Sequence, residues 1–221
     1  MAATYAYFPV FRRVSPAGLE DIDAAEAAHE WDLVHKEHAD RVAVRGTYVA
    51  EGFRPGAHVM AWWIAQSLDD LQAMLIDFRR TRIGRSLELT WAFTGVHRPP
   101  EFNPSHVPAF MAGKDPKRYL CVYPFVRTPD WYLLPPDERA AMLREHGEMG
   151  REFPDVLPNT TSAFGLGDWE WILAFEADQA HRLVDCIRRL RDARARRFTG
   201  EEVPFVLGIR KEPAEVVADL R

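Results

Sequence analysis

Two stretches, Val42-Ala-Val-Arg-Gly-Thr-Tyr-Val-Ala50 and Val59-Met-Ala-Trp-Trp-Ile-Ala65, decide the fold. Both are rich in β-branched and aromatic residues, and the glycine-bounded turn region Gly52–Gly56 separates them, which predicts two adjacent strands. A helix is expected to begin near Ser67, since the following Leu-Asp-Asp opens a stretch with apolar residues at helical spacing. A strand from Leu87 to Thr94 ends the series.

The residues before this stretch complete one structural repeat. Tyr5 to Val14 alternates and carries aromatics, as strands do, and Ser15-Pro16 then predicts a helix start with Ser as N-cap and Pro at the first position. This helix is expected to run to about His38. The first half of the chain therefore has the order β-α-β-β-α-β.

The second half predicts the same order. Its expected elements are a strand at Tyr119–Val126, a helix from Pro135 to about Phe153, strands at Thr160–Leu166 and Trp171–Phe175, a helix from Asp178 to about Arg197 and a strand at Val203–Ile209. The fold class is thus α+β, with two ferredoxin-like repeats in one chain. The expected division is an N-terminal repeat over 1–94, a connecting loop over 95–117 and a C-terminal repeat over 118–221.

Composition excludes several classes of protein. The chain has 221 residues, 47% of them hydrophobic, with 28 Lys and Arg against 33 Asp and Glu, so the net charge is −5. A chain this apolar can bury a core, which argues against disorder, and its acidity argues against general nucleic-acid binding. The sequence shows no signal peptide, no membrane-spanning run and no disulfide framework, which predicts a cytoplasmic protein that binds neither nucleic acid nor membrane.

His146 is a candidate ligand for a bound metal. It lies on the helix expected over Pro135–Phe153, and its same-face neighbours are Met142, Met149, Gly150 and Phe153. An imidazole on an apolar stripe suits axial ligation of a flat, apolar ligand, which Gly147 and Gly150 would allow to approach the helix closely. A core histidine satisfied by one hydrogen bond explains the same pattern, and the helix alone favours that simpler interpretation.

Tyr123 is a candidate redox-active or acid–base tyrosine. It lies in Tyr119-Leu-Cys-Val-Tyr-Pro-Phe-Val-Arg127, where a period of two places Tyr123, Phe125 and Arg127 on one face. An aromatic stripe that is simply core is the alternative. Pro124 cannot donate to a ladder, which indicates an edge strand or a bulge.

Two further segments carry ionisable residues. The irregular segment Gly95–Lys117 contains His106, which is either an acid–base catalyst near neutral pH or a solvated loop residue. The stretch Arg188–Arg197 holds six arginines within ten residues. It is either a solvated basic face or a docking site for anionic groups.

Together these segments resemble the actinobacterial coproheme decarboxylases of the chlorite dismutase-like superfamily. The matching stretches are Asp77–Thr81, His97–Asn103, Ser105–Phe110, Tyr119–Arg127, Trp131–Pro135, Glu145–Gly147 and Gly167–Glu176. The resemblance covers nearly the whole chain, and the separation of Tyr123 from His146 (146 − 123 = 23) is the spacing expected of this form.

The resemblance implies a fold and a set of site residues. Antiparallel sheets would form a barrel-like core with helices outside, and the protein would assemble as a homopentamer. His146 would be the proximal ligand of the iron, Tyr123 the redox-active tyrosine and His106 the distal base. The ligand-binding residues it implies are Arg127 at a propionate, Trp131 beside the tyrosine and Ala195 in the pocket wall.

The activity implied is the hydrogen peroxide-dependent decarboxylation of two propionates of Fe-coproporphyrin III (coproheme) to vinyls. A tyrosyl radical would carry it, and haem b would form through a three-propionate intermediate. The iron of the substrate is then the redox centre, so no separate metal cluster is required. A transient contact with coproporphyrin ferrochelatase is left open by the sequence.

The sequence leaves two alternative functions open. One is a chlorite dismutase-like or peroxidase-like haem enzyme, and the other is a non-enzymatic haem-binding protein on the same fold. Chlorite chemistry needs a distal arginine, and the segment Pro158–Phe164, where it would be expected, contains none.

Overall fold

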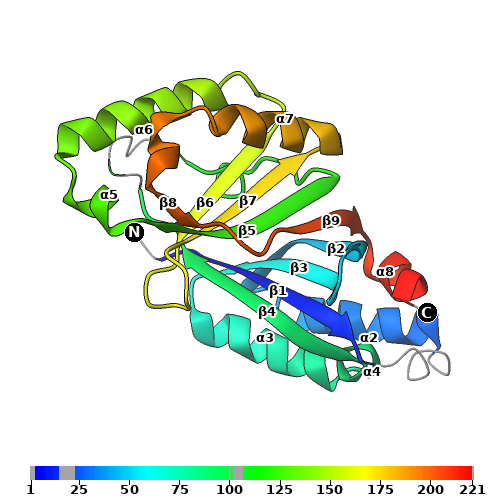
Figure 1. Ribbon diagram of the computed structural model, residues 1–221. Helices are drawn as coiled ribbons and strands as arrows, with labels where there is room; N and C mark the ends of the chain where they lie inside the picture. The colour runs from blue at the N-terminus through cyan, green and yellow to red at the C-terminus, as the bar shows by residue number, and fades with distance from the viewer. Residues whose placement is uncertain (1–2, 15–22, 100, 102–106, 221) are drawn as a thin grey trace. The chain divides into compact units, whose positions relative to one another are not determined.

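The structure, a computed structural model, describes residues 3–14, 23–99, 101 and 107–220 (Figure 1). The chain forms two compact units, one comprising Met1–His97 with Val206–Arg221 and the other Arg98–Phe205. Among the described residues, no helix combines the length and the apolar composition needed to cross a bilayer.

The first unit is an antiparallel sheet with helices. Its strands are β1 (Tyr5–Arg13), β2 (Val42–Arg54), β3 (Ala57–Ala65), β4 (Leu87–Val96) and β9 (Val206–Lys211), in the spatial order β4-β1-β3-β2-β9. Its helices are α2 (Ala24–Glu37), α3 (Leu68–Arg80), α4 (Arg82–Arg85) and α8 (Pro213–Leu220). Helices α2 and α3 lie along one side of this sheet (Figure 1). The core there includes Phe11, Trp31, Trp63, Phe78 and Val216.

Local signals account for most of these elements. Gly52 and Gly56 have φ values of 82° and 76°, the left-handed region that glycine adopts without strain, so the β2–β3 turn forms where the sequence predicts it. Helix α3 begins at the predicted position, because the Ser67 hydroxyl accepts a hydrogen bond from the Asp69 backbone. The expected helix start at Ser15 lies outside the described residues. Helix α2 is capped by Asp23, whose side chain accepts a hydrogen bond from the Glu26 backbone N–H.

The second unit is also an antiparallel sheet with helices. Its strands are β5 (Tyr119–Arg127), β6 (Leu157–Ser162), β7 (Trp171–Ala177) and β8 (Thr199–Glu201), in the order β6-β7-β5-β8. Its helices are α5 (Pro129–Leu133), α6 (Pro136–Gly150) and α7 (Ala180–Leu190), followed by the 3₁₀ helix η1 (Arg194–Phe198). The two antiparallel, helix-covered units confirm the predicted α+β class.

Several elements differ from the sequence-based expectations. The helix predicted over 178–197 ends at Leu190 and is followed by η1. The sequence pattern also gives no prediction of α4, α5, β8 or α8. The final strand begins at Val206 rather than Val203, since Pro204 has no N–H to donate to a ladder. This strand, β9, pairs with β2 of the first unit through Thr47 and Lys211.

Candidate functional site

Five of the six predicted site residues lie in the second unit. Tyr123 and Arg127 lie on β5, Trp131 on α5, His146 on α6 and Ala195 on η1 (Figure 1). The sixth, His106, lies outside the described residues.

Arg127 lies at the centre of the best-defined cluster. Its Nη1 donates a hydrogen bond of 2.8 Å to the carbonyl of Ala195. Its guanidinium carbon lies 4.5 Å from the ring centroid of Phe125 and 4.1 Å from that of Trp131, which holds the charged plane between two aromatic faces. The structure therefore brings Arg127, Trp131 and Ala195 into direct contact.

Arg127 forms no direct ion pair with a described carboxylate. Burial lowers its pKa to about 10, and the negative charges of Glu202 and Glu170, which act on it from beyond ion-pair distance, oppose this shift only in part. A half-buried cation without a counter-ion is unfavourable in the free protein and is well placed to bind an anionic group.

Glu170 connects the backbone of Arg127 to the side chain of Tyr132. Its Oε2 accepts a 2.8 Å hydrogen bond from the backbone N–H of Arg127 and a 2.5 Å hydrogen bond from the Tyr132 hydroxyl. The ladder between β5 and β8 shifts register between Val126 and Arg127, and this irregularity leaves the Arg127 N–H available to a side chain. Glu170 lies within the stretch Gly167–Glu176, whose sequence pattern gives no sign of this role.

Tyr123 is enclosed by aromatic rings. Its side chain is 4% exposed, and its ring stacks on Phe205 at 4.2 Å and on Phe175 at 6.0 Å. Burial raises the pKa of the phenol well above its ordinary value, so the group is protonated at every physiological pH. Its hydroxyl forms no hydrogen bond with any described residue, which leaves the O–H hydrogen unengaged.

The arginine-rich stretch is largely paired with the chain's own carboxylates. Glu202 accepts hydrogen bonds from both Arg191 and Arg196. Arg194 pairs with Glu145 at 2.7 Å, and Arg189 pairs with Glu152 at 2.8 Å. Of the arginines in this unit, Arg127 rather than this stretch presents the half-buried, unpaired charge.

His146 lies on a helix face that the protein covers only in part. Helix α6 has one fully buried residue among those described, Ala140, whereas the expected stripe around His146 is half-buried along its length. Burial lowers the pKa of His146, and the positive charge of Arg127 lowers it further. The lowered pKa favours the neutral imidazole, and no described residue hydrogen-bonds to the ring, so a nitrogen lone pair is left available for a ligand.

These features fit an iron porphyrin. A Cβ atom added at Gly147 or Gly150 would meet no atom within 4 Å, so space is open beside the helix face of His146. No group of three or more His, Cys, Asp or Glu side chains among the described residues could hold a bare metal ion. A single imidazole suits a metal whose other ligands come from a macrocycle. Arg127 suits the carboxylates on such a macrocycle.

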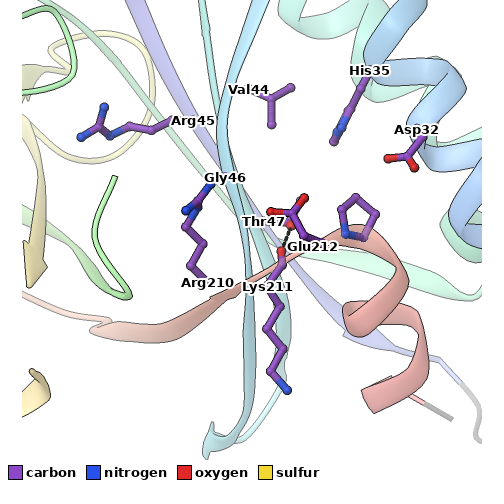
Figure 2. Close-up of a pocket in the computed structure, with 10 residues that line it drawn as sticks. Asp32, His35, Val44, Arg45, Gly46, Thr47, Arg210, Lys211 and Glu212 are labelled. Carbon is purple, nitrogen blue, oxygen red and sulfur yellow. Dashed lines mark hydrogen bonds between the residues drawn. The ribbon is translucent and has the colours of Figure 1, made fainter. Parts of the chain in front are cut away.

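The first unit contains a separate small cavity of about 130 Å³ (Figure 2). Asp32 and His35 of α2, Thr47 of β2 and Glu212 contribute to its lining, and none of the predicted site residues does. The imidazole of His35 accepts a 2.9 Å hydrogen bond from Trp31, and burial lowers its pKa to about 4. The cavity is far smaller than the pockets that hold drug-sized ligands, so it does not suit a tetrapyrrole.

Comparison with known proteins shows extensive similarity. Residues 24–211 match the family model described as chlorite dismutase. The chain is 48% identical over 218 residues to a protein of Mycolicibacterium smegmatis named coproheme decarboxylase, and the match covers 98% of this chain and 94% of that protein. A coproheme decarboxylase of Thermus thermophilus is 28% identical over 153 residues, which is 64% of this chain and 61% of that protein.

Solved structures support the fold. The structure of a mutant chlorite dismutase from Candidatus Nitrospira defluvii superposes with a TM-score of 0.87 at 22% identity, and the match covers 98% of this chain and 95% of that one. Another structure of the enzyme from that organism, in complex with imidazole, gives a TM-score of 0.86 at 21% identity.

Proposed function

The chain belongs to the chlorite dismutase family, and from that premise we propose that it is an enzyme that decarboxylates Fe-coproporphyrin III with hydrogen peroxide. The reaction would convert two propionates to vinyl groups and yield haem b through a three-propionate intermediate. The near full-length similarity to a protein named coproheme decarboxylase supports this substrate over others of the same fold.

One structural observation supports the proposal independently of the sequence similarity. Arg127 is a half-buried guanidinium held by Ala195 and two aromatic rings, and no carboxylate of the described chain forms an ion pair with it. Coproheme carries four carboxylates around an apolar ring. The substrate therefore supplies the anion that Arg127 lacks, and its ring covers the half-buried apolar face of α6.

His146 would hold the iron, since its imidazole is neutral and has a free lone pair. Bound there, the iron porphyrin supplies the redox chemistry with peroxide. His106 is assigned by the resemblance as the base that removes a proton from peroxide. An alanine at that position should slow the reaction at neutral pH, with partial rescue at alkaline pH, where peroxide loses its proton unaided.

Tyr123 would transfer the hydrogen atom. Its buried phenol keeps its proton and forms no hydrogen bond with a described residue, so it can give up a hydrogen atom and become a neutral radical, and the electron and proton released would contribute to the reduction of peroxide to water. That radical takes a hydrogen atom from the β-carbon of a propionate, which loses one further electron and carbon dioxide and becomes a vinyl group. One peroxide accepts the two electrons for each propionate and is reduced to water.

Assembly and location belong to the same proposal. The resemblance implies a homopentamer, the sequence features predict a cytoplasmic location, and a transient contact with coproporphyrin ferrochelatase would deliver the substrate. The distal arginine that chlorite chemistry needs has no counterpart in β6, whose sequence is Leu-Pro-Asn-Thr-Thr-Ser.

The test is to mix the purified protein with coproheme, titrate peroxide and measure the mass of the porphyrin. Two successive losses of carbon dioxide plus two hydrogens are expected. Tyr123→Phe should bind coproheme and leave all four propionates intact, because it keeps the ring stack and removes the transferable hydrogen. Bound but unchanged porphyrin in the unsubstituted protein would indicate a haem-binding protein, and oxygen release on adding chlorite would indicate chlorite dismutation.

A further inference from the structure

A second tyrosine next to the site is paired with a carboxylate. The Tyr132 hydroxyl donates a 2.5 Å hydrogen bond to Oε2 of Glu170, and the proposed function does not use this pair. Tyr132 directly follows Trp131, whose buried ring lies 4.1 Å from the Arg127 guanidinium. Tyr132 therefore lies one residue from the residues that would hold the substrate.

Aromatic rings continue from Tyr132 to the surface of the second unit. The Tyr132 side chain is 41% exposed, and its ring lies 6.1 Å from Phe164, which is 49% exposed. The ring of Phe164 lies 5.4 Å from that of Trp171. Tyr132 and Phe164 thus form an exposed aromatic pair, and Tyr132 directly follows the buried Trp131 in the sequence.

The chemistry of this pair differs from that of Tyr123. Oxidation of a phenol releases a proton as well as an electron, and a short hydrogen bond to a carboxylate provides an acceptor for that proton. Tyr123 has no hydrogen-bond partner among the described residues, whereas Tyr132 has one at 2.5 Å. Burial raises the pKa of Tyr132, so the proton is on the phenol before oxidation.

We propose that Tyr132 and Glu170 form a second redox-active site that carries surplus oxidising equivalents from the substrate site to the protein surface. The electron of Tyr132 reduces the oxidised site, its proton moves to Glu170, and a neutral tyrosyl radical remains at the surface. A small reductant such as ascorbate then returns a hydrogen atom to Tyr132, and Glu170 releases its proton to solvent. The source of the surplus oxidant, peroxide at a bound iron porphyrin, rests on the proposed function.

A purely structural role for Glu170 is the competing explanation, since the same oxygen also accepts the Arg127 N–H. Glu170→Gln separates the two roles. The amide oxygen can still accept from the Arg127 N–H and the Tyr132 hydroxyl, but the amide cannot take up a proton. A structural role predicts that this variant behaves as the unsubstituted protein in any oxidation of Tyr132.

The deciding experiment uses the full chain without porphyrin, so it does not depend on the proposed function. Tyrosine is oxidised by flash photolysis with ruthenium tris-bipyridine and a sacrificial quencher, and the tyrosyl radical is followed by absorbance and electron paramagnetic resonance. Tyr132→Phe should lose most of the radical signal, and Glu170→Gln should slow its formation at least about tenfold. The matched control Tyr119→Phe, which removes a half-buried tyrosine at the far end of β5, should retain the signal.

Two results would overturn the proposal. One is a radical signal in Tyr132→Phe equal to that of the unsubstituted protein, and the other is an unchanged rate of radical formation in Glu170→Gln. In the loaded protein, Tyr132→Phe should survive two- to threefold fewer peroxide additions before the porphyrin is bleached, and equal survival would refute the protective role. Failure of decarboxylation in the unsubstituted protein would refute the proposed function and leave the photolysis result to decide the redox role.

Discussion

Replacing Arg127 by methionine separates the effect of this residue on the free energy of unfolding from its effect on coproheme affinity. The apolar chain of methionine can still pack between Phe125 and Trp131, but the charge and the hydrogen bond to the Ala195 carbonyl are lost. The matched control is Arg118→Met, at the opposite end of β5, where the side chain is exposed.

The expected change in the free energy of unfolding is small. Burial lowers the pKa of Arg127 from 12.5 to about 10, and at about 1.4 kcal/mol for each pKa unit the charge destabilises the free protein by about 3 kcal/mol. Removing the guanidinium relieves that cost but also removes a charged hydrogen bond, which stabilises by about 1.5–3 kcal/mol. The two effects nearly cancel, so the net change should stay within about 1.5 kcal/mol.

The expected change in coproheme affinity is large. A charge-assisted hydrogen bond to a substrate carboxylate, at about 1.5–3 kcal/mol, corresponds to an affinity loss of about 10- to 100-fold. Denaturant unfolding of the porphyrin-free protein measures the first quantity, and titration with coproheme followed by absorbance measures the second. A variant that loses more than about 3 kcal/mol of stability and binds coproheme with unchanged affinity would show that Arg127 is structural and refute the reasoning.

Three further predictions concern single positions. Burial lowers the pKa of His146 below 6.5 in the folded protein, so between the folded and unfolded pKa values the unfolded chain binds more protons, and the free energy of unfolding should fall as pH drops through that window. His146→Gln should reduce this dependence of stability on pH. An unchanged dependence, measured by denaturant unfolding, would contradict a buried neutral ring. Alanine at Gly150 or Gly147 should stabilise the porphyrin-free protein by up to about 1 kcal/mol, since neither Cβ meets an atom within 4 Å. Only Gly150→Ala, which lies on the His146 face, should weaken coproheme binding. Equal coproheme affinities of the two variants would argue against close approach of the porphyrin to that face. Gly84→Ala should destabilise the protein by about 3 kcal/mol, because the added Cβ would lie 2.0 Å from the Phe78 carbonyl oxygen. Thermal unfolding measures this change, and a stability equal to that of the unsubstituted chain would mean that the backbone shifts at little cost.

The elements with strong local signals could be predicted from the sequence. The β2–β3 turn follows from two glycines in the left-handed region, and α3 begins at the serine that caps it. The end of α7 at Leu190 could not be predicted in this way, because the arginines that follow turn toward Glu202 in a non-local arrangement. The pairing of β9 with β2 could not be predicted either, because strand propensity does not say which distant strand a given strand will pair with.

The candidate site shows the same division. Residue types and spacing made Tyr123 and His146 candidates, but the local patterns alone favoured ordinary core residues, and only the resemblance to the family favoured functional roles. The unpaired state of Arg127 depends on where every carboxylate of the unit lies, and its bond to the Ala195 carbonyl has no sequence signature. Glu170 was missed for the same reason, since an acceptor for a backbone N–H at a register shift is defined only by the folded ladder.

The most direct test of this account is the crystal structure of the protein in complex with coproheme. The account predicts a bond between the imidazole of His146 and the iron, a propionate at the guanidinium of Arg127 and a second propionate beside the hydroxyl of Tyr123. Iron bound by any other side chain, with His146 remote from the porphyrin, would contradict it.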